Sequence, residues 1–491
     1  MEVSILVNKI PEYVSNTADL LINNGFKAYL VGGAVKDILL GNEPKDYDIA
    51  TDALPDQITA IFPRSVSINA KFGTILVIMS GRDGERHDVE VTTFRKEENY
   101  FGGRWPSKVE FTQDLLIDLS RRDFTINAMA IDLDNLYAVG ANSFEVVIDP
   151  YGGQEDLTNK IIRAVGDPLE RFGEDGLRAY RACRLAAVLQ FQIDEKTFDA
   201  IKQTLNIAKQ VSMERVRDEF LKLLKYSPKP SVGIELLRIS GLLEFSIPEL
   251  IECIGVNQPE WHTEDVYTHS LTTMDMAEDS IKLEALLHDI GKARTRSEDE
   301  SGVHFYSHDT VGAEMTKIIL ERLKFSNAVI KKVTTLIRWH MFYYPSADWR
   351  KVNPLEIINN DMDTKQGGWT DAAIRRFISN VGEEFIDDLF KLRIADANAN
   401  PKSTFDPVEI EALQQRISEV RSKDMALKVT DLQINGNDLE GIGINKGPEM
   451  GRVLNYLLEE VIEDPGNNTK ERLIELAKEF SQLTSNNKAT V

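Results

Sequence analysis

The sequence predicts an α+β head followed by a long all-α body, and two observations carry that prediction. Over the first 150 residues, short β-branched and apolar runs are mixed with a helical pattern. After a turn-forming stretch at 149–153, the apolar spacing is helical almost to the end of the 491-residue chain. A chain of this length is expected to form about three domains or more, each with its own core.

The head, residues 1–150, is predicted to hold four short strands and a helix. Apolar and β-branched residues predict strands at 28–31, 48–50, 74–79 and 88–94. An apolar helix pattern follows the pair Gly32 and Gly33 and stops at Gly41. The polar, aromatic and glycine-bearing segment 96–108 is expected to be a mobile loop.

Turn-forming residues divide the rest of the chain, in which we find no internal repeat. Proline-containing stretches at 227–230 and 400–401 mark two further boundaries. The expected domains are a head at 1–150, a helical neck at 151–228, a body at 229–400 and a helical tail at 401–491.

The composition is acidic and poor in cysteine. The 79 Asp and Glu against 57 Lys and Arg give a net charge of −22, which alone argues against a nucleic-acid partner. Residues 160–226, however, carry 13 Lys and Arg against 10 Asp and Glu, so the excess of negative charge lies outside this segment. Two cysteines in apolar contexts predict a reduced, cytoplasmic setting. The chain has no run of about 18 apolar residues, so we expect no membrane span.

A pair of carboxylates, Asp46 and Asp48, begins thirteen residues after Gly33. On a strand, side chains two residues apart point the same way, and their repulsion favours a divalent cation between them. The alternative is a solvated turn. The glycine pair precedes a helix start, where bare backbone amides can approach a phosphate; an ordinary strand-to-helix turn is the alternative there.

Two arginine-rich segments follow. Arg121 and Arg122 stand beside an acid and an amide, and a capped helix start is the alternative interpretation. The second segment places an acid and three arginines at three-residue spacing, which predicts one helix face: Asp175, Arg178, Arg181 and Arg184. Three arginines with a single leading acid favour an anionic ligand over a salt-bridged surface.

In this order, the motifs resemble those of the bacterial class II tRNA nucleotidyltransferases, the CCA-adding enzymes, and of the related poly(A) polymerases. The matching segments are a nucleotide-binding turn at 30–37, a metal motif at 46–51, a head-to-neck motif at 121–128, a base-selecting motif at 174–184 and a neck helix at 211–220. The resemblance implies a polymerase-β-like head and an elongated helical neck. It also implies template-independent addition of CCA to the 3′ end of tRNA from CTP and ATP.

The resemblance also implies roles for single residues. Asp46 and Asp48 would hold two Mg²⁺ ions, and Glu90 is our candidate for a third catalytic carboxylate. The nucleotide would be bound by Gly33, Lys36, Arg121, Arg122, Asp175, Arg178, Arg181 and Arg184. Relatives usually carry arginine where this chain has Lys36, so a phosphate contact there should be weaker or less directional.

Asp175 and Arg178 would select the base, and hydrogen-bonding chemistry supports that role. Cytosine and adenine both present an amine beside an unprotonated ring nitrogen, which suits an aspartate acceptor and an arginine donor. Uracil and guanine reverse this pattern and leave buried groups unpaired, at about 1–3 kcal/mol each. One acid and one arginine can therefore accept C and A without a template.

Two further segments resemble parts of the CCA-adding enzymes that contact RNA. The segment 96–108, with Arg104 as an RNA-binding candidate, corresponds to a flexible loop linked to the switch from C to A addition. Near the C-terminus, Lys446 and the Gly447 backbone would contact tRNA phosphates at a helix start. A simple helix-packing turn is the alternative for the second segment.

Six of the seven histidines fall within 79 positions, between His262 and His340. Four residues fit the order H…HD…D of the HD superfamily of metal-dependent phosphohydrolases: His269, His288, Asp289 and Asp396. The resemblance implies an HD body with a divalent metal, and imidazole with carboxylate suits a transition metal. Some HD-bearing CCA-adding enzymes hydrolyse phosphate esters, which implies a role in tRNA 3′-end repair. The alternative is a degenerate HD fold kept for its shape.

Three other functions are considered. The nearest is a poly(A) polymerase, or an enzyme that adds only A or only CC, with the same head chemistry. A second is an HD phosphohydrolase with a nucleotide-sensing head. A third is a non-catalytic RNA-binding factor, against which the intact metal and base-selecting sets argue.

Overall fold

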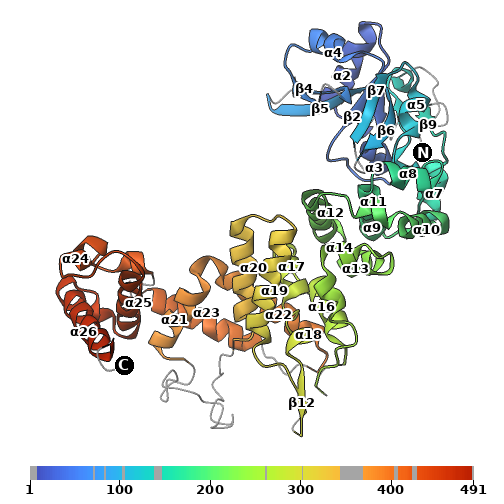
Figure 1. Ribbon diagram of the computed structural model, residues 1–491. Helices are drawn as coiled ribbons and strands as arrows, with labels where there is room; N and C mark the ends of the chain where they lie inside the picture. Colours follow the sequence, from blue (N-terminus) through green and yellow to red (C-terminus); the bar gives the residue numbers. More distant parts are fainter. Residues whose placement is uncertain are drawn as a thin grey trace. The chain divides into compact units, whose positions relative to one another are not determined.

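The protein is described here by a computed structural model that covers residues 8–69, 72–81, 84–101, 105–137, 146–259, 263–300, 302–342, 369–402, 407–422 and 428–488. The chain forms two compact units (Figure 1). Unit 1 comprises Met1–Ile251 with Ile319–Phe325, and unit 2 comprises Glu252–Ile318 with Ser326–Val491. Within the described ranges, no helix is both long and apolar enough to cross a membrane.

A seven-stranded mixed sheet forms the centre of the head, in the order β3-β4-β5-β2-β1-β8-β9. Its strands are β1 (Tyr29–Val31), β2 (Asp48–Thr51), β3 (Ser65–Asn69), β4 (Thr74–Ser80), β5 (Arg86–Thr93), β8 (Ala130–Asp132) and β9 (Val147–Ile148). The pair β2–β5 is parallel and the other pairs are antiparallel. The four predicted strands are confirmed as β1, β2, β4 and β5, and the side chains of β4 and β5 alternate between buried and more exposed positions.

Helices of the head flank this sheet: α2 (Glu12–Asn23), α3 (Gly33–Leu39), α4 (Pro55–Ile61) and α5 (Leu115–Ser120). The α2 and α4 helices contact β4 and β5, while α3 contacts β1. The predicted helix after the glycine pair is confirmed, and Gly41 ends it with a φ of 84°.

The predicted mobile loop at 96–108 is wrong for its described residues. They form an antiparallel hairpin of β6 (Arg95–Phe101) and β7 (Trp105–Phe111). The register places residues of opposite charge across the hairpin, such as Lys96 against Glu110. Such pairs stabilise strands in a polar segment whose composition alone does not indicate strands.

The neck is helical, as predicted. It contains α7 (Gly153–Asn159), α8 (Pro168–Glu174), α9 (Leu177–Leu189), α10 (Glu195–Gln203), α11 (Leu205–Ala208) and α12 (Met213–Tyr226), with a short parallel pair β10 (Ile161–Ile162) and β11 (Gln192–Ile193). Beyond the neck, unit 1 continues with α13 (Pro230–Ile239), α14 (Leu243–Ser246) and α15 (Pro248–Ile251). Small buried side chains on α9, including Ala182 and Ala186, let it pack closely against α12 and α13.

Unit 2 is almost entirely helical. Its helices are α16 (Val266–Met276), α17 (Lys282–Leu287), α18 (Lys292–Thr295), α19 (His308–Arg322), α20 (Asn327–Trp339), α21 (Asp371–Val381), α22 (Ile386–Ala399), α23 (Pro407–Arg421), α24 (Gly436–Glu440), α25 (Pro448–Glu463) and α26 (Lys470–Lys488), with a hairpin of β12 (Ser297–Asp299) and β13 (Gly302–His304). The last residues of α19 belong to unit 1.

Two helix groups matter within unit 2. The α16, α17, α20 and α22 helices contact one another. A separate apolar core joins α25 to α26 through residues such as Leu457 and Leu473. Short 3₁₀ turns connect elements in both units: η2 (Thr125–Asn127), η3 (Asn135–Tyr137), η4 (Asp279–Ile281), η7 (Glu383–Phe385), η8 (Val429–Asp431) and η9 (Pro465–Asn467).

Candidate active site and candidate metal centre

A cleft of about 910 Å³ lies in unit 1, between the head and the neck helices α9 and α12. Almost all of the head and neck residues predicted to hold metal or nucleotide line it: Gly33, Lys36, Asp46, Asp48, Arg121, Arg122, Asp175, Arg178, Arg181 and Arg184. Residues from at least four sequence segments therefore meet at one concave surface, as a small-molecule site requires.

The carboxylate pair lies at the entry to β2. Asp48 is the first residue of the strand, and Asp46 lies in a bend just before it, so the expectation that both are on a strand is wrong for Asp46. The buried Tyr47 between them still leaves both carboxylates on the cleft side. Glu90 does not line the cleft, but it lies opposite Asp48 in the parallel register of β2 and β5.

The electrostatics at Asp48 fit a cation site. Burial, together with the charges of Glu90 and Asp46, raises the pKa of Asp48 to about 6 against the opposing effect of Arg122. Three acids near one another form an oxygen-rich anionic set, which suits Mg²⁺.

Gly32 allows the turn before α3 to lie against this set. Its φ is 74°, a conformation that favours glycine. A Cβ atom here would lie 3.1 Å from Nη1 of Arg122 and 3.5 Å from Oδ2 of Asp48. A side chain at this position would therefore be strained and would crowd the acid.

Asp118 orients the arginine pair, and the sequence interpretation missed it. Its Oδ1 accepts from Nη2 of Arg121 at 2.7 Å, and its Oδ2 accepts from Nη2 of Arg122 at 3.2 Å. Burial alone would raise the pKa of Asp118, but the two guanidiniums bring it below its ordinary value. The available signal was the spacing, since an acid three and four residues before two arginines meets them on a helix.

Each arginine of α9 has an acidic partner from another part of unit 1. Arg178 pairs with Glu174 of α8, Arg181 with Asp123 at 2.7 Å, and Arg184 with Glu219 of α12. The sequence pattern showed a single leading acid, but folding brings in three more. The arginines are therefore held in place before any ligand binds.

Asp123, the partner of Arg181, has a lowered pKa. Burial would raise its pKa, but Arg181, the Asn127 amide and Arg178 lower the pKa to about 2. The Asp123 carboxylate is thus charged at any physiological pH, and its ion pair with Arg181 connects α9 to the segment that follows α5. This contact links the arginine face to the segment that carries Arg121 and Arg122.

Asp175 lies before α9 rather than on it, so its expected place on the helix face is wrong. Its backbone is extended, and its Oδ1 accepts from the Leu177 amide at 3.0 Å, which caps the helix. Its Oδ2 accepts from Nη2 of Arg215 at 2.7 Å. Arg215, on α12, is a cleft residue that the sequence interpretation did not single out.

Arg178 is 9% exposed and bound on several sides. Besides Glu174, it donates to the carbonyls of Arg171 and Arg121, each at 2.9 Å. A guanidinium has five N–H donors, so these three bonds do not use all of them.

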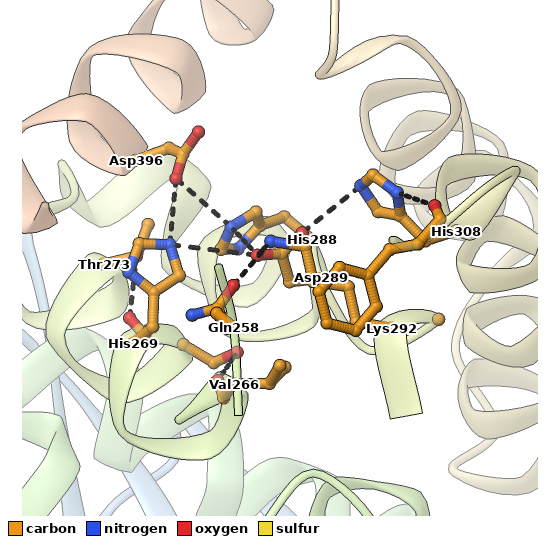
Figure 2. A network of polar contacts seen from close by, with 12 residues as sticks. Gln258, Val266, His269, Thr273, His288, Asp289, Lys292, His308 and Asp396 are labelled. Carbon is orange, nitrogen blue, oxygen red and sulfur yellow. Dashed lines mark hydrogen bonds and ion pairs between the residues drawn. The ribbon is translucent and has the colours of Figure 1, made fainter. Parts of the chain in front are cut away.

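The four residues of the predicted HD set meet inside unit 2 (Figure 2). Nε2 of His269 lies 2.9 Å from Oδ1 of Asp396, and Nε2 of His288 lies 3.2 Å from Oδ2 of Asp289. The ligand atoms of His269, His288 and Asp396 all lie within 4.8 Å of one another. The elements that bring them together are α16, the α17–α18 turn and α22.

Two cations also contact these acids. Nζ of Lys292 lies 2.6 Å from Oδ2 of Asp289, and Nη1 of Arg393 lies 3.1 Å from Oδ2 of Asp396. Burial lowers the pKa of His288, but the neighbouring carboxylates of Asp289 and Asp396 raise it to about 10. Metal binding at His288 would therefore displace a proton.

Two further histidines, His308 and His340, complete this cluster. Their Nε2 atoms lie 3.5 and 3.6 Å from Oδ1 of Asp289. The sequence interpretation counted both among the clustered histidines but gave them no role. Burial lowers the pKa of His308, so its imidazole is neutral near pH 7.

Gly291 lets α19 approach the cluster. A Cβ atom at this position would lie 2.1 Å from the carbonyl oxygen of His308 and 2.6 Å from the amide nitrogen of Gly312. Both are backbone atoms, so no side chain can be accommodated without moving α19. The glycine two residues after Asp289 is therefore required by packing.

Of the two residues predicted to contact RNA, Lys446 lies in the described part of the chain and Arg104 does not. Lys446 is exposed near the start of α25 and lies 3.3 Å from Glu440. Arg104 and His262 lie outside the described residues.

Family models match three segments of the chain. Residues 28–163 match the poly A polymerase head domain, and residues 190–254 match the model described as "Probable RNA and SrmB- binding site of polymerase A". Residues 297–477 match the tRNA nucleotidyltransferase domain 2 family.

Curated relatives agree with these matches. A CCA-adding enzyme of Lactococcus lactis is 42% identical over 247 residues, which are 50% of this chain and 58% of that enzyme. A CCA-adding enzyme of Enterococcus faecalis is 47% identical over 200 residues, which are 41% of this chain and 46% of that enzyme. The chain spans about half the length of the curated relatives it matches.

Solved structures share the fold over nearly the whole chain. The Bacillus stearothermophilus CCA-adding enzyme in complex with CTP matches with a TM-score of 0.63 and 25% identity, covering 97% of this chain and 98% of that one. A Thermotoga maritima CCA-adding enzyme complexed with tRNA matches with a TM-score of 0.51 and 19% identity, covering 98% and 99%. The predicted fold class, an α+β polymerase-β-like head followed by a helical body, is confirmed.

Proposed function

We propose that this chain, a relative of the CCA-adding enzymes and the poly A polymerases, adds CCA to the 3′ end of tRNA from CTP and ATP. One observation carries the proposal: the acid pair, the arginines of α9 and the pair Asp175 and Arg178 all line one cleft. The names of the relatives support the choice of tRNA, CTP and ATP as substrates.

In this proposal Asp46, Asp48 and Glu90 hold two Mg²⁺ ions. When bound, these ions promote attack by the RNA 3′-hydroxyl and neutralise the triphosphate. The new bond joins the 3′ oxygen to the α-phosphorus, and pyrophosphate leaves. Asp48 must be ionised to contribute, so its neighbours matter to the metal affinity.

The basic residues of the cleft bind the triphosphate. Arg181 and Arg184 keep guanidinium donors beyond those given to Asp123 and Glu219, and Arg121, Arg122, Lys36 and the Gly33 amide complete the set. Lys36 pairs with its neighbour Asp37, so its contact with phosphate is shared.

Asp175 and Arg178 select the base. Each oxygen of Asp175 accepts one bond from the protein and keeps a further lone pair for the amine of C or A. Arg178 keeps unused N–H donors for the ring nitrogen. Because Arg215 and the Leu177 amide fix the carboxylate, it cannot turn away from an unsuitable base.

The tRNA would be held by shape and phosphates along the head at 1–150, the neck at 151–228 and the tail at 401–491. Lys446, exposed at the start of α25, and Arg104 would contribute phosphate contacts.

The test is extension of tRNA that lacks its 3′ CCA, with each NTP alone and with CTP and ATP combined. We expect CC from CTP alone and CCA from the mixture, with magnesium required. Long A tracts would instead identify a poly(A) polymerase, and a product that stops at CC or needs CC already present would identify a partial enzyme. No incorporation under any condition would contradict the proposal.

A second function is proposed for the body at 229–400, because the four HD residues converge in unit 2. We propose that His269, His288, Asp289 and Asp396 hold a divalent transition metal. When bound, the metal would polarise a phosphate ester for hydrolysis, as repair of a damaged tRNA 3′ end requires. Release of phosphate from 3′-phosphorylated RNA ends, and opening of 2′,3′-cyclic ends to a 2′- or 3′-phosphate, test this; no hydrolysis of either end with Mn²⁺, Co²⁺, Ni²⁺ or Zn²⁺ would contradict it.

A further inference from the structure

The cleft of unit 1 continues past the acids and arginines proposed to bind the nucleotide. Its volume of about 910 Å³ lies near the upper end of ordinary small-ligand pockets, which hold about 300–1,000 Å³. The lining at this further end has a different chemistry, with two lysines, a tyrosine and aliphatic side chains: Lys45, Leu185, Val188, Lys222 and Tyr226. None of them belongs to the proposed nucleotide set, so the cleft has room and lining residues for a second ligand.

One face of α12 lines the cleft along the length of the helix. Arg215 stands near the start of this face, where it pairs with Asp175 at 2.7 Å. Lys222 and Tyr226 follow seven and eleven residues later, and these spacings return to the same helix face. At 1.5 Å per residue, Tyr226 lies about 16 Å along the helix from Arg215. The end with Tyr226 is therefore separated from the residues proposed to select the base.

The α9 helix supplies the apolar wall of this end. Leu185 is 6% exposed and Val188 is half-buried, and both line the cleft beyond the arginines. Tyr226, by contrast, is 41% exposed. An exposed aromatic ring in a cleft with aliphatic walls suits a flat, partly apolar ligand such as a nucleobase.

Lysines surround the Tyr226 ring. Nζ of Lys45 lies 4.0 Å from the ring centroid, and Nζ of Lys225 lies 5.3 Å from it. Lys222, one helical turn before Tyr226, has a half-exposed side chain that lies 3.6 Å from Glu219. Proteins that bind single-stranded nucleic acid combine cationic groups for the phosphates with aromatic rings on which bases stack.

The proposed reaction supplies the reason for such a ligand. The RNA 3′-hydroxyl must reach Asp46 and Asp48, so the end of the RNA has to enter this cleft beside the nucleotide. Lys45 directly precedes Asp46, which makes the lysine and tyrosine end continuous with the acids. Stacking on a tyrosine reads no base sequence, as an enzyme that accepts many different RNAs requires.

We propose that Lys45, Lys222 and Tyr226, with the apolar end of α9, bind the last unpaired nucleotides of the RNA acceptor. A base stacks on Tyr226, and the lysines contact the phosphates on either side of it. The inference rests on the proposed nucleotidyl transfer and names the acceptor subsite of the same cleft. Lys45 and Tyr226 both lie outside the segments 46–51 and 211–220, which carry the family resemblance.

Stacking is tested with RNA hairpins that have a short unpaired 3′ end, in which 2-aminopurine replaces either of the last two bases. The fluorescence of 2-aminopurine falls when its ring stacks on an aromatic side chain. Each probe is saturated with the full-length protein in the absence of nucleotide. We expect quenching of at least one probe by the parent, loss of that quenching in Tyr226→Ala, and its retention in Tyr226→Phe.

Leu221→Ala is the matched control, because Leu221 is 38% exposed on the same helix but does not line the cleft. It should quench as the parent does. Absence of quenching by the parent, or equal quenching by the parent and Tyr226→Ala, would overturn the inference. The parent measurement needs no substitution, so it also covers the case in which a variant does not fold.

The phosphate contacts are tested by the salt dependence of RNA binding. Lys222→Ala should lower the slope of log affinity against log salt concentration by about 0.7, the value for one phosphate contact of a single strand. Lys202→Ala is the control, since Lys202 pairs with Asp199 at 3.8 Å and does not line the cleft. Equal slopes for the parent and Lys222→Ala would overturn the proposed phosphate contact.

Steady-state kinetics separates the two substrates of the cleft. Tyr226→Ala should raise the KM for RNA by about tenfold, the effect of losing one stacked base, with the KM for CTP unchanged. A rise in the KM for CTP alone would assign this end to the nucleotide and overturn the inference. The fluorescence test does not depend on catalysis, so quenching without CMP incorporation would contradict only the proposed function.

Discussion

Asp48 and Glu90 lie directly opposite each other in the parallel pair of β2 and β5. Directly paired residues of neighbouring strands point to the same face of a sheet, so the two carboxylates act on one another. This contact is one reason why the pKa of Asp48, raised first by burial, reaches about 6. The register thus brings a third acid to the pair Asp46 and Asp48.

Glu90→Gln should lower the rate of CMP incorporation by about 100-fold, because one oxygen ligand becomes a neutral amide. Single-turnover incorporation at several Mg²⁺ concentrations measures the effect. Asp88→Asn is the control, since Asp88 is two residues earlier on β5 and pairs with the exposed Arg86. Equal rates for the Glu90→Gln variant and the parent would remove Glu90 from the metal set.

Arg215→Ala should weaken base selection, because Oδ2 of Asp175 loses the bond that fixes it. We expect the ratio of kcat/KM for CTP over UTP to fall by about tenfold, which is about 1.4 kcal/mol. Arg215→Lys should restore part of the ratio. Arg217→Ala is the control, because Arg217 is on the same helix but pairs with Asp218. An unchanged ratio in Arg215→Ala would show that Asp175 is held by other means.

Stability should depend on pH through Asp123. Its pKa is about 2 in the folded chain, below the ordinary value of 3.8, so its contribution is full above about pH 4 and is lost as the pH falls toward 2. The contribution is about 2 kcal/mol, since each pKa unit is about 1.4 kcal/mol. Urea unfolding of the parent and Asp123→Asn between pH 5 and pH 2 checks this. Curves that stay parallel over that interval would be inconsistent with the ion pair to Arg181.

Gly291→Ala should disturb unit 2, because its Cβ would meet backbone atoms of His308 and Gly312 at 2.1 and 2.6 Å. Overpacking of this kind costs about 1–3 kcal/mol, and displacement of the turn that carries His288 and Asp289 should also lower metal retention. Thermal unfolding and metal content measure both effects. Gly451→Ala is the control, since a Cβ on that helical residue would meet nothing within 4 Å. A variant with unaltered melting and metal content would show that α19 adjusts freely.

Much of the fold and of the candidate site could be predicted from the sequence, since both depend on local patterns. β-Branched runs gave β4 and β5, and helical spacing gave α9 and α25. The order of the motifs predicted which residues would meet at the cleft, because each motif is a short segment of characteristic residue types. The H…HD…D order likewise predicted four residues that converge in unit 2.

What could not be predicted depends on tertiary contacts. The pairing of Arg184 with Glu219 joins residues 35 positions apart, and no local pattern signals it. The pairing of β6 with β7 depends on cross-strand contacts that are known only once the register is known. The approach of His308 and His340 to Asp289 likewise depends on how α19 and α20 pack in unit 2.

The acids that hold the arginines of α9 have a consequence for how tightly any nucleotide can bind. Long side chains lose conformational entropy when they are fixed, and Glu174, Asp123 and Glu219 impose that loss during folding. If the proposed function holds, an arriving triphosphate would therefore meet arginines whose conformational entropy is already lost. The same acids weaken the net positive field, so we expect a moderate nucleotide affinity that would allow pyrophosphate to leave.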